Sequence, residues 1–349
     1  MVTDHSFLAS LGWQTFFYQQ LSLEEWDLSV PARIFSQHKS LFELETESGG
    51  LLIPHVPSMP PLTVGDWVLL DKDHRFIRML ERKSCFSRKA AGTKLTEQMI
   101  AANVDTAFIA CSLNDDFNLN RIERYLCLAY EADVEPVVVL TKSDLCDRVD
   151  QFRLQVLGLG DRLAVEAVNC LSTESVAALK PWCTSGKTLV MLGSSGSGKS
   201  TLINRLLGEE IQVTSRIREA DCKGRHTTTR RSLFAMKEGA LLLDTPGMRE
   251  LQLADCDAGV SHAFADIALL AEDCRFSDCQ HNAEPGCAVQ EAVTTGVLDE
   301  RRLKNWRKLL REQALNAASL AERREHDRQF VRSCRQVLRE SYKYKRGES

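Results

Sequence analysis

The chain has 349 residues, of which 44% are hydrophobic and 26% charged, and its formal net charge is -4. This composition excludes a chain that is disordered throughout, and the length favours more than one domain. Apolar runs such as 137–140 and 241–243 are far too short to span a membrane. The acidic N-terminus lacks the basic start and apolar stretch of a secretion signal. We therefore expect a soluble, cytoplasmic protein.

Charge is unevenly distributed along the chain. Residues 300–349 contain 15 Lys and Arg against 7 Asp and Glu, whereas residues 1–299 contain 29 against 41. A basic end on an acidic body indicates a polyanionic partner, although a solvated helix face has the same composition. Most of the 12 cysteines, such as Cys111, Cys127 and Cys170, stand singly in apolar surroundings. Such cysteines are typical of buried, reduced thiols.

Residues 1–29 form an N-terminal extension, and residues 30–90 form the first predicted domain. In that domain apolar residues alternate with polar ones in short runs at 32–35, 42–46, 51–54, 64–70 and 76–80, separated by Gly and Pro turns. This pattern predicts an OB-like β-barrel. Barrels of this type often bind nucleic acid, so we expect RNA contact, which the fold alone does not establish.

Residues 91–255 read as buried strands alternating with helices. The Val- and Leu-rich runs are 106–111, 136–140, 164–168, 188–193 and 240–244, and the helices are 119–130 and a segment from Lys199. This alternation predicts an α/β domain whose parallel sheet is covered on both faces. Ligands of such sheets bind at the carboxyl ends of the strands. The nucleotide motifs described next all stand at such ends.

The segment GSSGSGKST follows a predicted strand and opens a helix. Its glycines let backbone N–H groups turn toward a phosphate, and the helix N-terminus adds positive potential. Lys199 is expected to neutralise phosphate charge during catalysis, and Ser200 to bind Mg²⁺. The predicted phosphate-binding residues are Gly193, Ser194, Ser195, Gly196, Ser197, Gly198, Lys199, Ser200 and Thr201.

The segment DTPG (244–247) ends the last predicted strand of this domain. Asp244 would reach Mg²⁺ through water, and the Gly247 N–H would meet the γ-phosphate. Because Asp-x-x-Gly is also a common turn, this assignment depends on the phosphate loop beside it.

The segment TKSD comprises Thr141, Lys142, Ser143 and Asp144. The Asp144 carboxylate can accept two hydrogen bonds from guanine, whereas adenine offers no such donor pair, and Lys142 would pack over the base. A buried polar mismatch of this kind discriminates by about 10⁴- to 10⁵-fold. The alternatives are that TKSD only caps a helix, or that the chain is an ATPase. Because TKSD precedes the phosphate loop, the domain is predicted to be circularly permuted.

The charged segment 216–231 lacks apolar periodicity and is predicted to be an exposed loop. One of its threonines, for which Thr228 is our choice, would bind Mg²⁺ only when a γ-phosphate is present. Many GTPases carry a water-positioning Gln directly after DxxG, but this chain has Met248 there. We therefore expect slow intrinsic turnover, with His226 as the candidate catalytic residue. The alternative for His226 is contact with a partner.

The third predicted domain, residues 256–349, contains Cys274, Cys279, His281 and Cys287. Three thiolates and one imidazole can close a tetrahedral Zn²⁺ site, which indicates one structural ion rather than a catalytic one. The alternative is a reduced cysteine cluster with an incidental histidine. The remainder of the domain shows helical spacing, with one apolar stripe formed by Leu303, Trp306 and Leu310.

Together these motifs resemble those of the ribosome small subunit-dependent GTPase family (RsgA, also called YjeQ). The matching segments are AANVD, LNRIERYL, TKSD, GSSGSGKSTLIN, GRHTTT, DTPGMRE and CRFSDCQHNAEPGC, and the similarity covers roughly residues 30–345. The N-terminal extension and the proline-rich segment PHVPSMPP depart from the family pattern.

The resemblance implies a monomeric, late-acting assembly factor that binds the small ribosomal subunit and its rRNA. It implies GTP hydrolysis stimulated by the subunit, with participation of His226. Because DTPG leads almost directly into the zinc segment, the nucleotide could move the C-terminal domain and thereby set RNA affinity. The competing hypothesis is a zinc-dependent RNA-binding scaffold that scarcely hydrolyses its nucleotide.

Overall fold

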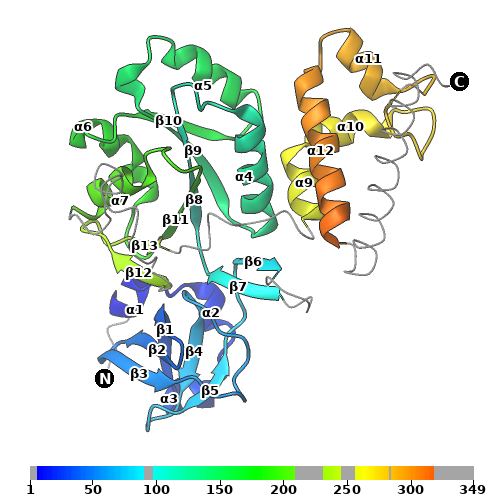
Figure 1. Cartoon of the computed structure of the whole chain (residues 1–349). Helices are drawn as coiled ribbons and strands as arrows, with labels where there is room; N and C mark the ends of the chain where they lie inside the picture. The colour runs from blue at the N-terminus through cyan, green and yellow to red at the C-terminus, as the bar shows by residue number, and fades with distance from the viewer. Residues whose placement is uncertain (1–5, 90–96, 209–230, 245–255, 283, 318–349) are drawn as a thin grey trace, which may run out of the picture.

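The computed structural model describes residues 6–89, 97–208, 231–244, 256–282 and 284–317. A β-rich N-terminal part, a central sheet with helices and a helical C-terminal part lie next to one another (Figure 1). The sequence-based assignments of His226, Thr228, Gly247 and Met248 lie outside the described residues. Every helix in the described ranges is too short or too polar to cross a membrane.

The N-terminal part contains short helices followed by antiparallel strands. The elements are α1 (Ser6–Ser10), α2 (Thr15–Tyr18), α3 (Leu23–Leu28), β1 (Val30–Gln37), β2 (Leu41–Thr46), β3 (Gly49–Pro54), β4 (Trp67–Leu70) and β5 (Phe76–Met79). The strands pair in the order β3-β2-β1-β4-β5. Strand β1 pairs with both β2 and β4, and its register with β2 shifts between Ile34 and Ser36.

The predicted strand at 64–70 begins later than expected, at Trp67. Gly65 has a φ of +93°, and a Cβ there would lie 2.0 Å from the carbonyl oxygen of Ala102. The backbone therefore turns before the strand starts, and the Asp66 N–H donates to the Thr63 carbonyl at 3.2 Å. Only glycine fits this conformation and this close approach.

The N-terminal extension is part of the folded structure. Its apolar side chains form a core with one face of β4, and Trp13 packs against Trp67 with ring centroids 4.7 Å apart. The other face of β4 contributes Val68 and Leu70 to the core of the strand domain. Strand β4 is consequently buried on both faces, which explains its continuous apolar sequence.

The central part contains the predicted parallel sheet. Its parallel strands are β8 (Thr106–Ser112), β9 (Glu135–Thr141), β10 (Ala164–Val168), β11 (Thr188–Gly193) and β13 (Leu241–Asp244). They pair in the order β10-β9-β8-β11-β13. Strand β12 (Arg231–Ala235) then pairs antiparallel with both β13 and β1, so one continuous sheet joins the central and N-terminal parts. Strand β12 and the hairpin of β6 (Cys85–Lys89) and β7 (Glu97–Ala102) were not predicted.

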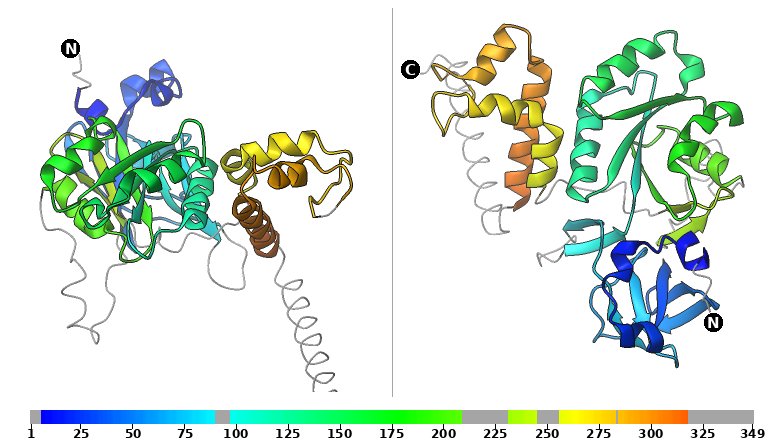
Figure 2. Two further views of the ribbon diagram at one scale, coloured as in Figure 1. Left: turned by 90° about the horizontal axis from the view of Figure 1, so that it is seen from above. Right: turned by 180° about the vertical axis from the view of Figure 1, so that it is seen from behind.

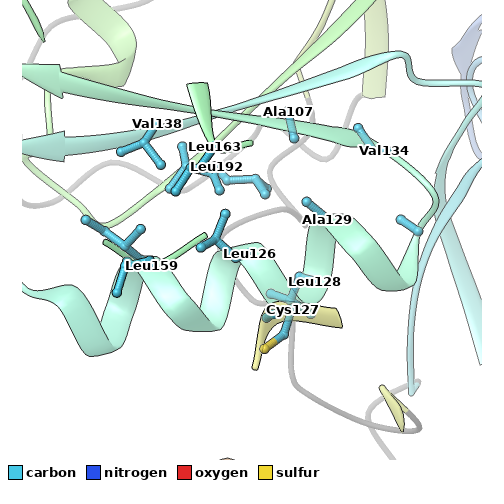
Figure 3. Close-up of a cluster of buried hydrophobic side chains, with 14 of the residues drawn as sticks. Ala107, Leu126, Cys127, Leu128, Ala129, Val134, Val138, Leu159, Leu163 and Leu192 are labelled. Carbon is cyan, nitrogen blue, oxygen red and sulfur yellow. The ribbon is translucent and has the colours of Figure 1, made fainter. Parts of the chain in front are cut away.

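Helices cover both faces of the central sheet, as predicted. They are α4 (Leu119–Glu131), η1 (Ser143–Leu145), α5 (Val149–Leu157), α6 (Thr173–Val176), η2 (Ala177–Trp182) and α7 (Lys199–Leu207). Separate apolar clusters fill the two faces. In one of them Leu126 of α4 lies under Val138 and Leu192 of the sheet (Figure 3).

The C-terminal part consists of α9 (Asp257–Ala263), α10 (Ala265–Glu272), α11 (Ala288–Thr294) and α12 (Glu300–Ala317). Helices α9 and α12 lie beside α4 of the central part in each view (Figure 2). In the predicted apolar stripe of α12, Leu303 is buried, Trp306 is half-buried and Leu310 is exposed. We call residues 256–317 the zinc module because they contain the Cys/His cluster that is predicted to bind Zn²⁺.

Candidate nucleotide and metal sites

The guanine-type segment and the phosphate loop lie at the same edge of the central sheet. The register aligns Ser112 of β8 with Thr141 of β9, and Ala110 of β8 with Gly193 of β11. The Thr141 hydroxyl donates to the Ser197 carbonyl of the phosphate loop at 2.8 Å. The fold therefore brings together two segments that are far apart in the sequence.

The phosphate loop has the backbone shape that its glycines permit. Gly193, Gly196 and Gly198 have φ values of +141°, +79° and +86°. A Cβ on Gly193 would lie 2.4 Å from the Ala110 carbonyl oxygen, and one on Gly198 would lie 3.3 Å from the Thr141 hydroxyl oxygen. These glycines let the loop curl tightly against its neighbours.

The first turn of α7 follows this loop and suits an anionic ligand. Its N-cap, Gly198, offers no side-chain hydrogen bond to the first N–H groups of the helix. Such groups need an external acceptor, and phosphate oxygens are suitable. The buried Lys199 ammonium donates to the Gly193 carbonyl at 2.7 Å and to the Ser194 carbonyl, so its charge lies within the loop. Ser200 and Thr201 are half-buried in the same turn, whereas Ser195 and Gly196 are exposed.

TKSD forms a tight turn directly after β9. Lys142 has a φ of +58°, and its side chain makes no capping hydrogen bond to the following 3₁₀ turn that contains Ser143 and Asp144. The Asp144 side chain is exposed at the sheet edge. Burial and the negative charge of Asp144 raise the pKa of Cys170 to about 11, so the loop after β10 lies beside this carboxylate.

The structure also places Asp116, which the sequence analysis missed, beside the phosphate loop. The Ser194 hydroxyl donates to Asp116 Oδ2 at 2.9 Å, and Arg121 Nη1 donates to the same oxygen at 2.7 Å. These hydrogen bonds lower the pKa of Asp116. Asp115 and Asp116 follow the carboxyl end of β8, and this position was the available signal, because polar residues there face the ligand edge. Asp244 ends β13, opposite Ser232 of β12.

The four predicted metal ligands gather in one place in the zinc module. The ligand atoms of Cys274, Cys279, His281 and Cys287 all lie within 4.8 Å of one another. The Cys274 and Cys287 sulfurs are 3.8 Å apart, and each lies 3.5 Å from His281 Nδ1. A tetrahedral ion bound at about 2.3 Å by sulfur and about 2.0 Å by nitrogen requires separations of nearly these lengths. The donor set and its spacing therefore fit Zn²⁺.

Neighbouring helices hold the ligand His281 in place. Its backbone has a φ of +60°, and its carbonyl accepts hydrogen bonds from Gln290 of α11 and Arg307 of α12. Its ring lies 5.7 Å from the Trp306 ring, measured between centroids. The cluster thus ties its loop to both helices, as a structural site would.

Two features define the class of protein. A glycine-rich loop precedes a helix N-terminus, and a guanine-type segment from an earlier part of the chain lies at the same sheet edge. This is a P-loop nucleotide-binding domain of circularly permuted order.

Comparison with known proteins gives the family. Residues 79–254 match the family described as RsgA GTPase, and the chain belongs to that family. It is 55% identical over 349 residues to "Small ribosomal subunit biogenesis GTPase RsgA 2" of Vibrio parahaemolyticus serotype O3:K6 (strain RIMD 2210633), covering 100% of this chain and 97% of the relative. The protein of the same name from Vibrio vulnificus (strain CMCP6) is 57% identical over 338 residues, covering 97% of each chain.

Solved structures show the same fold. YjeQ from Thermotoga maritima matches with a TM-score of 0.60 and 25% identity, over 82% of this chain and 98% of that one. YloQ, described as a circularly permuted GTPase, matches with a TM-score of 0.56 and 22% identity, over 81% and 94% of the two chains. The predicted permuted order and the predicted family are confirmed.

Proposed function

We propose that the protein is a cytoplasmic GTP hydrolase that acts in assembly of the small ribosomal subunit. The observation that carries this proposal is the Thr141–Ser197 hydrogen bond, which joins the guanine-type segment to the phosphate loop. The curated relatives are named small ribosomal subunit biogenesis GTPases. The geometry of the site and the similarity to these relatives therefore both support GTP hydrolysis.

The residues of the proposed nucleotide site bind different parts of GTP. Asp144 accepts the guanine N–H groups and selects GTP over ATP, while Lys142 covers the base. The loop N–H groups from Gly193 to Thr201 and the Lys199 ammonium hold the phosphates, and Ser200 and Asp244 hold Mg²⁺ directly or through water. Hydrolysis transfers the γ-phosphoryl group to water and releases GDP and phosphate. His226, Thr228 and Gly247 complete the proposed site.

In this proposal the first and third domains bind RNA. Residues 30–90 form an OB-type barrel, which the strand order β3-β2-β1-β4-β5 and the bend in β1 support. Residues 91–255 form the GTPase domain, to which residues 1–29 and the barrel are attached. Residues 256–349 form the third domain, in which one structural Zn²⁺ holds the Cys/His cluster and basic helices contact rRNA phosphate. The protein acts on the subunit as a monomer.

The test is phosphate release from GTP with and without purified small ribosomal subunits. We expect strong stimulation by subunits in the wild-type protein and loss of activity at working GTP concentrations in Asp144→Asn. The control is Asp147→Asn, which removes the same charge from an exposed position in the same loop and should keep activity. Absence of stimulation at saturating subunit would contradict the proposal and favour the RNA-binding scaffold.

A further inference from the structure

Helix α4 is linked to the phosphate loop through Asp116, which precedes it, and contacts the zinc module through α9 and α12. At its start, Asp116 accepts the Ser194 hydroxyl at 2.9 Å and Arg121 Nη1 at 2.7 Å. Arg121 lies in the first turn of α4, whose N-cap Asn118 accepts the Arg121 N–H. The short loop before α4 is therefore hydrogen-bonded to Ser194 of the phosphate loop.

The opposite face of the same helix holds the zinc module through charged side chains. Glu123 is fully buried and accepts from Arg301 at 2.9 and 3.0 Å and from Arg302 at 2.9 Å. One residue further along, Arg124 donates to Glu312 at 2.7 Å. All three partners belong to α12.

The far end of α4 packs equally closely against α9. The Gly259 N–H donates to Glu131 Oε2 at 2.7 Å, and a Cβ on Gly259 would lie 2.1 Å from the Cys127 carbonyl oxygen. Tyr130 stacks on His262 with ring centroids 4.0 Å apart. Because these contacts leave no space between the helices, a shift of α4 must displace the zinc module with it.

We propose that α4 transmits the occupancy of the phosphate loop to the zinc module, and that Asp116 is the positioning residue at its sensing end. This inference rests on the proposed binding of GTP. Phosphate oxygens entering the loop compete with Asp116 as acceptors for the Ser194 hydroxyl. Their charge also repels the Asp116 carboxylate and attracts Arg121. The loop of Asp116 and the first turn of α4 then take a different position, and α9 and α12 follow.

This route differs from the one that the sequence suggested. There the signal runs through the segment from Met248 to Cys256 that follows DTPG, of which residues 248–255 lie outside the described residues. Substitution of Asp116 alters the α4 route at its start and leaves that connection unchanged. The two routes can therefore be separated.

The experiment is amide hydrogen exchange of the full-length, zinc-loaded protein without nucleotide and with a non-hydrolysable GTP analogue. In the wild type we expect exchange rates in α9 and α12 to differ by about fivefold or more between the nucleotide-free and the analogue-bound protein, the lower end of typical allosteric coupling. Asp116→Asn should remove most of this difference while retaining nucleotide binding. The matched control is Asp115→Asn, which removes the same charge from the adjacent exposed position and should behave as the wild type.

Titration with a fluorescent guanine nucleotide accompanies each exchange measurement. A wild-type protein that binds the analogue without any change in α9 and α12 would overturn the coupling and leave the GTPase proposal intact. A full response in Asp116→Asn would overturn the α4 route. Loss of nucleotide binding in Asp116→Asn would overturn its positioning role and place it in the binding site. A wild-type protein that binds no guanine nucleotide would overturn both proposals.

Discussion

The central domain is joined to its two neighbours by different kinds of contact. The N-terminal part is attached through strand pairing of β1 with β12, and through Arg33, which is 1% exposed. Arg33 donates to the backbone carbonyls of Gly65 at 3.3 Å and Asn103 at 3.0 Å, and also to that of Leu11. The zinc module is attached through side chains on both sides, centred on Glu123.

The difference indicates which junction depends on single side chains. Backbone ladders and carbonyl acceptors cannot be removed by replacing one side chain, and they fix the N-terminal part against the sheet. A buried carboxylate surrounded by arginines depends on each partner, because breaking such a pair leaves an uncompensated charge. We therefore regard the N-terminal junction as rigid and the zinc-module junction as sensitive to single substitutions.

Removal of the metal should have the largest effect, and it should be confined to the zinc module. Structural zinc sites contribute about 10–16 kcal/mol of apparent binding free energy. We expect a chelator, or Cys274→Ser, to abolish amide protection in α11 and α12 while the central sheet keeps its protection. Cys146→Ser, a half-buried cysteine outside the cluster, is the control. Unchanged exchange after complete metal removal would show that the cluster is not structural.

Loss of the central carboxylate should have the next largest effect. Glu123→Ala leaves Arg301 and Arg302 without their shared acceptor, and breaking a buried pair costs about 3–5 kcal/mol. The free energy of unfolding of the zinc module, measured by native-state hydrogen exchange, should fall by this amount. Glu135→Ala, at an exposed position, should change it by less than about 0.5 kcal/mol. Equal losses in the two variants would show that the junction does not depend on Glu123.

Replacement of Arg33 should have a smaller effect on the other junction. Arg33→Met keeps much of the buried volume, and the Gly65 carbonyl still accepts from Asn103 Nδ2 at 3.0 Å. The loss at the junction is the donor to the Asn103 carbonyl, which costs about 1–3 kcal/mol. We expect a lower melting temperature of the N-terminal part, measured by thermal denaturation, with exchange in β1 and β12 still slow. Detachment of β1 from β12 in this variant would contradict the rigid junction.

The smallest effect should come from pH at Asp105, which is 7% exposed on its side chain. Burial raises the pKa of Asp105, but the Thr188 N–H and the ammonium groups of Lys83 and Lys187 outweigh this effect, so its net pKa is lowered. A carboxyl whose folded-state pKa is lowered contributes stability above its unfolded pKa of about 3.9, and the contribution is lost as pH falls through the folded value. Urea denaturation of Asp105→Asn between pH 3 and 5, values chosen around that pKa, should show a shallower loss of stability than the wild type. An identical slope would rule out this role.

Local patterns were sufficient for the parts of the molecule that depend on backbone chemistry. The Val- and Leu-rich strands, the phosphate loop after β11 and the ligand spacing of the Cys/His cluster could all be predicted, because each needs particular residues at fixed separations. The edge shared by Thr141 and Ser197 could be predicted as well, because parallel strands end together.

Long-range contacts could not be predicted in this way. No local signal shows that Arg33 is buried under residues far along the chain, or that Glu123 meets α12. The hairpin of β6 and β7 lacks a clear alternation of polar and apolar residues. Strand β12 pairs with both β13 and β1, and β1 lies far from it in the sequence. Asp116 was missed because an aspartate after a strand is more often a turn residue than part of a site.

Calorimetric titration of the full-length protein with GTP, GDP and ATP tests the central claim most directly. We predict that guanine nucleotides bind at least about a thousandfold more tightly than ATP, and that Asp144→Asn removes most of this preference, because the bound base would cover this carboxylate, and a polar group covered without its partner discriminates by about 10⁴-fold or more. Equal binding of ATP and GTP by the wild-type protein, or an unchanged guanine preference in Asp144→Asn, would contradict the account.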